Sequence, residues 1–109
     1  MNWTKLETPE DLAALNKKSN TVAQLIFKHS TRCSVSSMAL SRVERAGQPK
    51  NIELHFLDLL AFRSLSDQIA RDYNVRHESP QILLIKNEHC VFNASHGHIN
   101  TLELAEKIK

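Results

Sequence analysis

The stretch FKHSTRCSVSSMAL (residues 27–40) holds the change of residue pattern that decides the fold. Up to Ser30, the run TVAQLIFKHS is almost continuously apolar and rich in β-forming residues at its centre, which predicts a strand buried on both faces. Cys33 is predicted to stand where this strand gives way to a helix. After it, apolar residues recur at helical spacing on one face, at Val35, Met38, Ala39, Val43 and Ala46.

Further elements are predicted on either side of this junction. Gly47, with Pro49 soon after, ends the helix that follows Cys33. Thr8 suits the N-cap of an earlier helix, with Asp11 three residues later. Helices are predicted over residues 8–18, 64–75 and 101–109, and strands over residues 52–59, 81–85 and 90–95, with a short strand before the first helix.

The order of these elements indicates the architecture. A β-α-β half is followed by a β-β-α half, which is the arrangement of the thioredoxin fold, with a parallel pair of strands and a final antiparallel hairpin. A generic α/β domain would give a similar order. We predict one thioredoxin-like domain over residues 1–109, an α/β fold with three α/β/α layers around a central mixed β-sheet.

Composition narrows the classes of partner. The chain has 109 residues and a net charge of +2, and it contains no block of Lys or Arg, so nucleic acid is not a predicted partner. No apolar run approaches the ~18 residues that cross a membrane, and the acidic N-terminus does not resemble a signal peptide. Cys33 and Cys90 are too few for a disulfide framework, so we expect a reducing, cytoplasmic compartment.

The predicted place of Cys33 suits a reactive thiol. At the start of a helix, unpaired N–H groups and the positive end of the helix dipole favour the thiolate, and the adjacent Arg32 adds positive charge. The alternative is an inert buried thiol, against which the polar neighbours argue. Ser36 follows at the spacing of C-x-x-S, where its hydroxyl could donate a hydrogen bond to the thiolate but cannot resolve a mixed disulfide.

Pro80 is the second feature of the predicted site. It stands in HESPQILLI immediately before a buried strand, where proline marks a strand start. In the thioredoxin fold a cis-proline occupies this place and faces the redox cysteine. We therefore predict a cis bond between Ser79 and Pro80, with the backbone of Ser79 presented to an extended substrate. An ordinary trans-proline in a loop is the alternative.

These stretches together resemble a known family. FKHSTRCSVSSMAL, HESPQILLIKN and SHGHI, with Trp3 and IARDYNVRHESPQ, are similar to the monothiol bacilliredoxins, also called bacillithiol-system redox-active proteins. The similarity runs along nearly the whole chain. Two positions depart from related patterns: Ser34 stands where the family usually has Pro or Gly, and Phe27 stands where thioredoxins keep a buried acid.

The resemblance implies removal of bacillithiol from S-bacillithiolated proteins. It makes Cys33 the attacking thiol, puts Ser36 at the place of a missing resolving cysteine, and makes Pro80 substrate-facing. The implied partners are S-bacillithiolated client proteins and a low-molecular-weight thiol, with bacillithiol as co-substrate and no metal or tightly bound cofactor. Two other functions stay open: a thioredoxin-like adaptor that turns nothing over, and a glutaredoxin-like iron–sulfur carrier.

Several polar residues carry weaker expectations. Lys28 is interpreted either as a surface cation that steers the carboxylates of bacillithiol or as an ordinary solvated lysine. His29 is expected to be structural, with tuning of the strand end before Cys33 as the alternative. His77 and Glu78 are expected to pin the proline loop, with substrate recognition as the alternative. A metal site built from His96, His98, Cys90 and His89 is considered and not predicted.

Hydrophobic side chains and the second cysteine complete the predictions. Trp3, Phe56, Phe62 and Tyr73 are expected in the core. Cys90 is expected roughly 15 Å from Cys33, because about five residues of strand separate them, which is too far for a resolving role.

Overall fold

The predicted order of helices and strands is confirmed by a computed structural model that describes residues 2–107. The C-terminal helix is shorter than predicted, because a 3-10 turn precedes it; residues 108–109 of that prediction lie outside the described residues. The elements are β1 (Trp3–Lys5), α1 (Pro9–Lys18), β2 (Ala23–His29), α2 (Ser34–Ala46), β3 (Ile52–Asp58), α3 (Arg63–Asp72), β4 (Gln81–Lys86), β5 (His89–Ser95), the 3-10 turns η1 (His96–His98) and η2 (Thr101–Glu103), and α4 (Leu104–Lys107).

Local sequence signals set the ends of two helices. The Thr8 hydroxyl accepts a hydrogen bond from the Asp11 N–H at 3.0 Å, and the Asp11 carboxylate accepts one from the Thr8 N–H at 3.2 Å. This reciprocal capping box starts α1, as predicted. Gly47 ends α2 with a φ of +87°, a left-handed value that glycine adopts at low cost.

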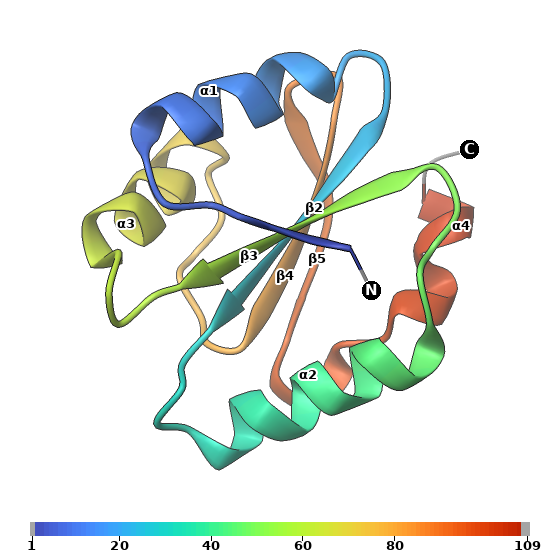
Figure 1. Cartoon of the computed structure of the whole chain (residues 1–109). Coiled ribbons are helices and arrows are strands. Elements are labelled where there is room, and N and C mark those ends of the chain that lie inside the picture. Colours follow the sequence, from blue (N-terminus) through green and yellow to red (C-terminus); the bar gives the residue numbers. More distant parts are fainter. Residues whose placement is uncertain (1, 108–109) are drawn as a thin grey trace.

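Five strands form one mixed sheet in the order β1-β3-β2-β4-β5. β3 pairs in parallel with β1 and β2, and β4 runs antiparallel to β2 and β5. Helices α1 and α3 cover one face of the sheet and α2 and α4 the other (Figure 1). The three-layer thioredoxin-like architecture is therefore confirmed, and β2 lies at its centre.

Each face of the sheet has its own apolar core. Phe27, fully buried on the α2 side, lies in ring contact with Trp3 and Phe56. Phe62 and Tyr73 are partly buried against the cluster on the α1 and α3 side. All four residues expected in the core thus pack against one of the two clusters.

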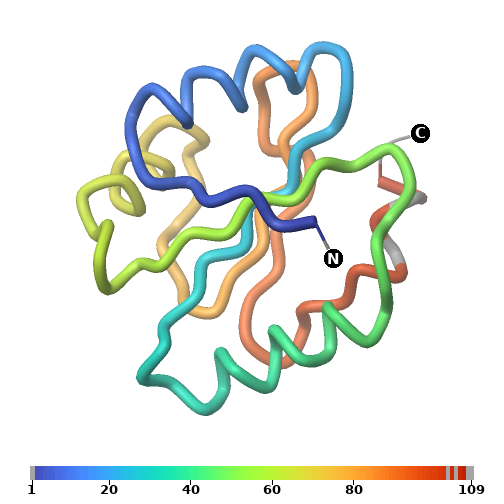
Figure 2. Tube along the Cα trace, in the orientation of Figure 1, coloured from blue at the N-terminus to red at the C-terminus, as the bar shows by residue number. Residues whose placement is uncertain are grey.

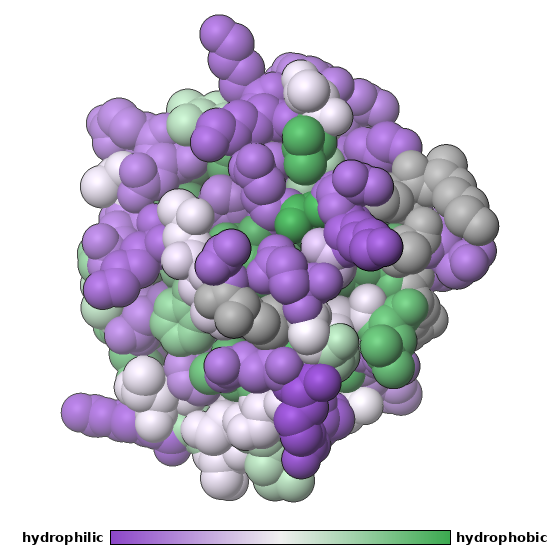
Figure 3. Space-filling view, turned by 45° about the vertical axis from the view of Figure 1, so that its right-hand side comes forward, coloured by the Kyte–Doolittle hydropathy of each residue, from purple (hydrophilic) through white to green (hydrophobic). Residues whose placement is uncertain are grey.

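The face of the molecule shown in Figure 3 is predominantly polar. In the face shown in Figure 3, hydrophobic side chains occur as small separate areas among hydrophilic ones. No helix within residues 2–107 combines the length and apolar character that spanning a membrane requires.

A buried histidine makes stability depend on pH. His55 is 6% exposed, and its Nε2–H donates to Gln24 Oε1 at 2.6 Å. Burial lowers the pKa of His55 below its ordinary 6.5. The unfolded chain therefore takes up a proton near pH 6.5 while the folded chain does so only at lower pH, so the contribution to stability is full above about 6.5 and falls as the pH is lowered.

We expect His55→Gln to flatten this acid dependence, because the amide keeps a donor toward Gln24 and does not titrate. The free energy of unfolding, measured by denaturant titration between pH 7 and pH 5, should fall less steeply in the variant, with a difference of up to about 1.4 kcal/mol per pH unit. His29 and His77, whose pKa values burial also lowers, should leave a residual slope. A variant that follows the wild-type slope would contradict this account.

Candidate active site

Cys33 caps the N-terminus of α2 just after the central strand. It has extended backbone angles (φ −113°, ψ 119°), its N–H donates to the Ser30 carbonyl at 3.2 Å, and its carbonyl accepts from the Ser37 N–H at 3.1 Å. The thiol is half-buried. Among the described residues, its Sγ has no hydrogen-bond partner. The predicted strand-to-helix junction is confirmed, and it leaves a sulfur at the positive end of a helix.

Ser36 is fully buried behind Cys33. Its Oγ accepts from the Ser30 N–H at 3.1 Å and lies 2.7 Å from His29 Nδ1. The expected hydrogen bond from this hydroxyl to the Cys33 thiolate is absent, because the hydroxyl is engaged with the end of β2. The sequence did not reveal this contact, which depends on how α2 docks on the sheet. His29 is structural, as expected, and burial lowers its pKa, which favours the neutral ring.

Two apolar residues of the first turns of α2 are open to solvent. Val35 is 47% and Met38 63% exposed, so the helix that begins after Cys33 carries apolar side chains on its surface. Arg32 is also exposed, and it forms no ion pair with any described residue. A partner that approaches Cys33 would therefore meet a mixed apolar and cationic surface.

The Ser79–Pro80 peptide bond is cis, as predicted. Gln81, the next residue, pairs with Lys28 near the end of β2, so the proline lies at the end of the sheet from which the chain continues to Cys33. Figure 2 shows the loop between α3 and β4 at that end of the sheet. The Pro80 carbonyl accepts from the His96 N–H at 3.0 Å. The Ser79 hydroxyl is buried and has no partner among the described residues.

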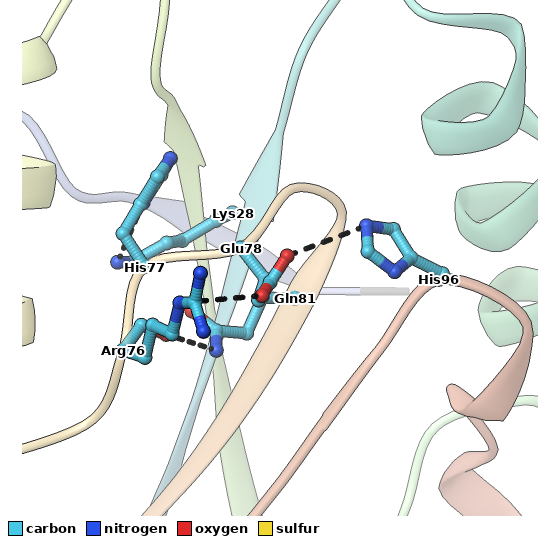
Figure 4. A network of polar contacts seen from close by, with 6 residues as sticks. All are labelled: Lys28, Arg76, His77, Glu78, Gln81 and His96. Atoms are coloured by element: carbon cyan, nitrogen blue, oxygen red, sulfur yellow. Dashed lines mark hydrogen bonds and ion pairs between the residues drawn. The ribbon is translucent and has the colours of Figure 1, made fainter.

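Polar contacts pin the loop before Pro80 (Figure 4). Gln81 Nε2 donates to the Arg76 carbonyl at 3.0 Å, and Glu78 lies 4.0 Å from Arg76 and 3.7 Å from the His96 ring. Arg42 on α2 donates to the His96 carbonyl at 3.0 Å, which ties the helix to η1, and the His96 N–H in turn contacts Pro80. The expected pinning role of Glu78 fits this geometry. Sequence reasoning missed the contacts of His96 with Glu78 and Arg42, since neither partner carries a local motif for them.

The expectation that Lys28 is a surface residue is wrong. Its side chain is 0% exposed, so it neither steers an anion nor extends into solvent. It alternates with Phe27 along β2 and therefore lies on the opposite face, where its Nζ donates to the Ser66 carbonyl on α3 at 3.2 Å. Burial lowers the pKa of Lys28 to about 8, and the Asp67 carboxylate partly offsets that effect.

The considered metal ligands do not come together. His89 and Cys90 lie at the start of β5, whereas His96 and His98 follow its end. Within residues 2–107, no three His, Cys, Asp or Glu side chains form a group that could hold a metal ion.

Strand pairing places the two cysteines at opposite ends of the sheet. Cys90 pairs with Ile85, which pairs with Gln24 at the start of β2, whereas Cys33 follows the end of that strand. The five residue-to-residue steps along β2 from Gln24 to His29 span about 16 Å. Burial also raises the pKa of Cys90, which disfavours its thiolate.

We therefore expect no intramolecular disulfide in the folded protein, because a disulfide needs Cα atoms within about 7 Å. After diamide treatment of the native monomer, peptide mapping should find Cys33 in mixed or intermolecular disulfides. The same treatment in denaturant is the control, since the unfolded chain can bring both thiols together. A Cys33–Cys90 bond formed efficiently under native conditions would contradict the observed register.

Comparisons with known proteins identify the family and the fold of the chain. The family model described as "Monothiol bacilliredoxin BrxC" matches residues 4–104. A solved structure described as a putative oxidoreductase with a thioredoxin fold has a TM-score of 0.85 and 29% identity, over 98% of this chain and 94% of that one. Two thioredoxins show the fold alone. The thioredoxin from Malassezia sympodialis has a TM-score of 0.75 and 10% identity, and the match covers 96% of this chain and 87% of that one. The thioredoxin from Fasciola hepatica has a TM-score of 0.69 and 22% identity, and the match covers 95% of this chain and 94% of that one.

Proposed function

Because the chain belongs to the monothiol bacilliredoxin family, we propose that it removes bacillithiol from S-bacillithiolated proteins by thiol–disulfide exchange at Cys33. The membership and the fold make it a thioredoxin-like thiol redox protein. The observation that carries the finer proposal is the half-buried Cys33 at the start of α2, with Ser36 where a second cysteine would stand. A lone thiol at such a place suits transfer of a small adduct.

The proposed reaction consists of two thiol–disulfide exchange steps. The Cys33 thiolate attacks the bacillithiol sulfur of the client mixed disulfide; that S–S bond breaks, and the client sulfur leaves as a thiolate that takes a proton from water. Cys33 is then joined to bacillithiol. A second thiol, free bacillithiol or another redox protein, gives up its proton and attacks the bacillithiol sulfur of this adduct. The bond to Cys33 breaks and releases its thiolate, and the second thiol is left joined to bacillithiol by a disulfide. Electrons pass between sulfur atoms throughout, so neither step requires a metal or a bound organic cofactor.

The site residues have distinct roles in this proposal. The start of α2 and the neighbouring Arg32 supply positive charge beside the sulfur that attacks in the first step and is released in the second. Ser79 offers its backbone groups to the client chain beside the buried Pro80, and Val35 with Met38 supply apolar contact. S-bacillithiolated clients and a low-molecular-weight thiol are the proposed partners, in a reducing cytoplasm.

Intact-mass spectrometry of a singly bacillithiolated client tests the proposal. With a substoichiometric amount of the protein and excess bacillithiol, the client should lose the adduct over many turnovers. A client that keeps its adduct, while Cys33 is merely modified once, would indicate an adaptor. Anaerobic purification that yields a brown protein with charge-transfer absorbance would indicate iron–sulfur carriage. A glutathionylated client is the matched comparison, and faster release from it would move the function toward a glutaredoxin.

A further inference from the structure

Lys28 is buried in a way that demands an explanation. It is the only Lys, Arg, Asp or Glu with a buried side chain in the described part of the chain. A buried charge is costly unless hydrogen bonds compensate it. Its Nζ has two close partners, the Ser66 carbonyl at 3.2 Å and His77 Nδ1 at 3.3 Å. The side chain therefore connects β2, α3 and the loop that carries His77.

The chemistry of this contact defines the state of His77. An ammonium group only donates hydrogen bonds, so Nδ1 of His77 must accept and the ring must be neutral. Ser66 Oγ lies 3.2 Å from the same nitrogen. Burial and the charge of Lys28 lower the pKa of His77, which keeps the ring neutral at neutral pH. The contact is thus intact at neutral pH and is opposed when the ring gains a proton.

His77 belongs to the loop between α3 and β4 that ends in the cis-proline. Figure 4 shows its side chain meeting Lys28 on one side of the loop, while Glu78 reaches His96 on the other. Lys28 lies on β2, the strand whose end leads to Cys33. One central strand thus carries both the contact that holds the loop and the junction that presents the thiol.

We propose that Lys28 and His77 are positioning residues that hold residues 78–80 in place relative to Cys33. Neither side chain needs to touch the substrate, because the buried contact acts through the loop backbone. Without it, the loop keeps its contacts with His96 and the hydrogen bond from Gln81 to the Arg76 carbonyl, but Lys28 no longer ties His77 to β2. The part of the proposal that concerns catalysis rests on the proposed thiol exchange.

Three variants and one control separate this role from general stability. His77→Leu removes the acceptor, whereas His77→Asn puts an amide oxygen near the place of Nδ1 and does not titrate. Lys28→Met removes the donor from the other side of the contact with a chain of similar length. His89→Leu, at an exposed position on the far end of β5, is the matched control.

Amide hydrogen exchange gives the readout that needs no substrate. His77→Leu and Lys28→Met should lose protection at the His96 N–H, whose acceptor is the Pro80 carbonyl, with no change in the middle of α2, whereas His77→Asn and His89→Leu should match the wild type. As the pH falls below 6.5, wild-type protection corrected for intrinsic exchange should fall, while His77→Asn should not follow. The charged groups that bear on this ring are Lys28, Asp67, Arg63 and Glu78. Unchanged protection in His77→Leu, or an equal loss in His77→Asn, overturns the proposal.

Kinetics then decide whether the position matters for exchange. We expect His77→Leu to lower kcat/KM for client release by about 10- to 100-fold, chiefly through KM, because a misplaced binding segment costs orientation. Alkylation of Cys33 by neutral iodoacetamide should stay within about twofold, and His77→Asn should restore release. Loss of loop protection with unchanged release, or a parallel loss of Cys33 alkylation, overturns a positioning role. If the wild type fails on the bacillithiolated client, the proposed function fails, and the same comparison is made with a glutathionylated client.

Discussion

Replacing Cys33 with serine is expected to reduce client release to the uncatalysed background while leaving the fold intact. The thiolate is the nucleophile in thiol–disulfide exchange, and a serine hydroxyl does not replace it. Cys90 cannot substitute, because strand pairing puts it at the other end of the sheet. The substitution exchanges one half-buried atom that has no hydrogen bond among the described residues. The free energy of unfolding should therefore stay within about 0.5 kcal/mol of the wild type.

Intact-mass spectrometry of the client and denaturant unfolding of the variant are the two measurements. Cys90→Ala is the matched control, since it removes the other thiol and should keep client release. Catalytic turnover by Cys33→Ser would show that another group carries the chemistry. Loss of turnover in Cys90→Ala would show that this thiol takes part despite its position.

Replacing Phe27 with alanine is expected to lower the free energy of unfolding more than any of the other substitutions. The ring is 0% exposed, stacks on Phe56 with centroids 6.3 Å apart, and meets the edge of Trp3 at 5.9 Å. Removing a buried phenylalanine leaves a cavity at the centre of the sheet and costs about 3–5 kcal/mol. Small domains are stable by about 5–15 kcal/mol, so this single change removes a large share of the total.

Urea unfolding followed by circular dichroism measures this loss as a lower midpoint at constant slope. Leu102→Ala is the control, since that side chain is 74% exposed and should change the free energy of unfolding by no more than about 0.5 kcal/mol. A loss below about 1 kcal/mol for Phe27→Ala would show that the surrounding core collapses around the missing ring.

The sequence predicted those features that follow from local patterns. The change from a continuous apolar run to helical spacing located Cys33, and a proline before a buried strand located the cis bond, which the structure contains. Thr8 and Asp11 predicted the start of α1, because the residues of a capping box lie only three positions apart. Each of these signals lies within a few residues of the feature that it predicts.

Contacts between distant residues were harder to predict. Lys28 was interpreted from its charge, yet it lies in a run whose other members are all buried, and the pattern of the run was the better guide. Its partners come from α3 and from the loop before β4, 38 and 49 residues away, so no local window contains them. The Ser36–His29 contact spans only seven residues, but it forms only because α2 folds back against the end of β2.

Ser36 has a consequence for reaction order. In a dithiol protein the second sulfur displaces the adduct from within the chain, at a rate that the concentration of outside thiols does not set. Here a buried hydroxyl, held by His29 and Ser30, occupies that place. Displacement of an adduct from Cys33 is then a second-order process that depends on a thiol from solution. We expect the lifetime of the adduct to be inversely proportional to the concentration of that thiol. The fraction of the protein that carries the adduct therefore reports the concentration of the thiol in solution.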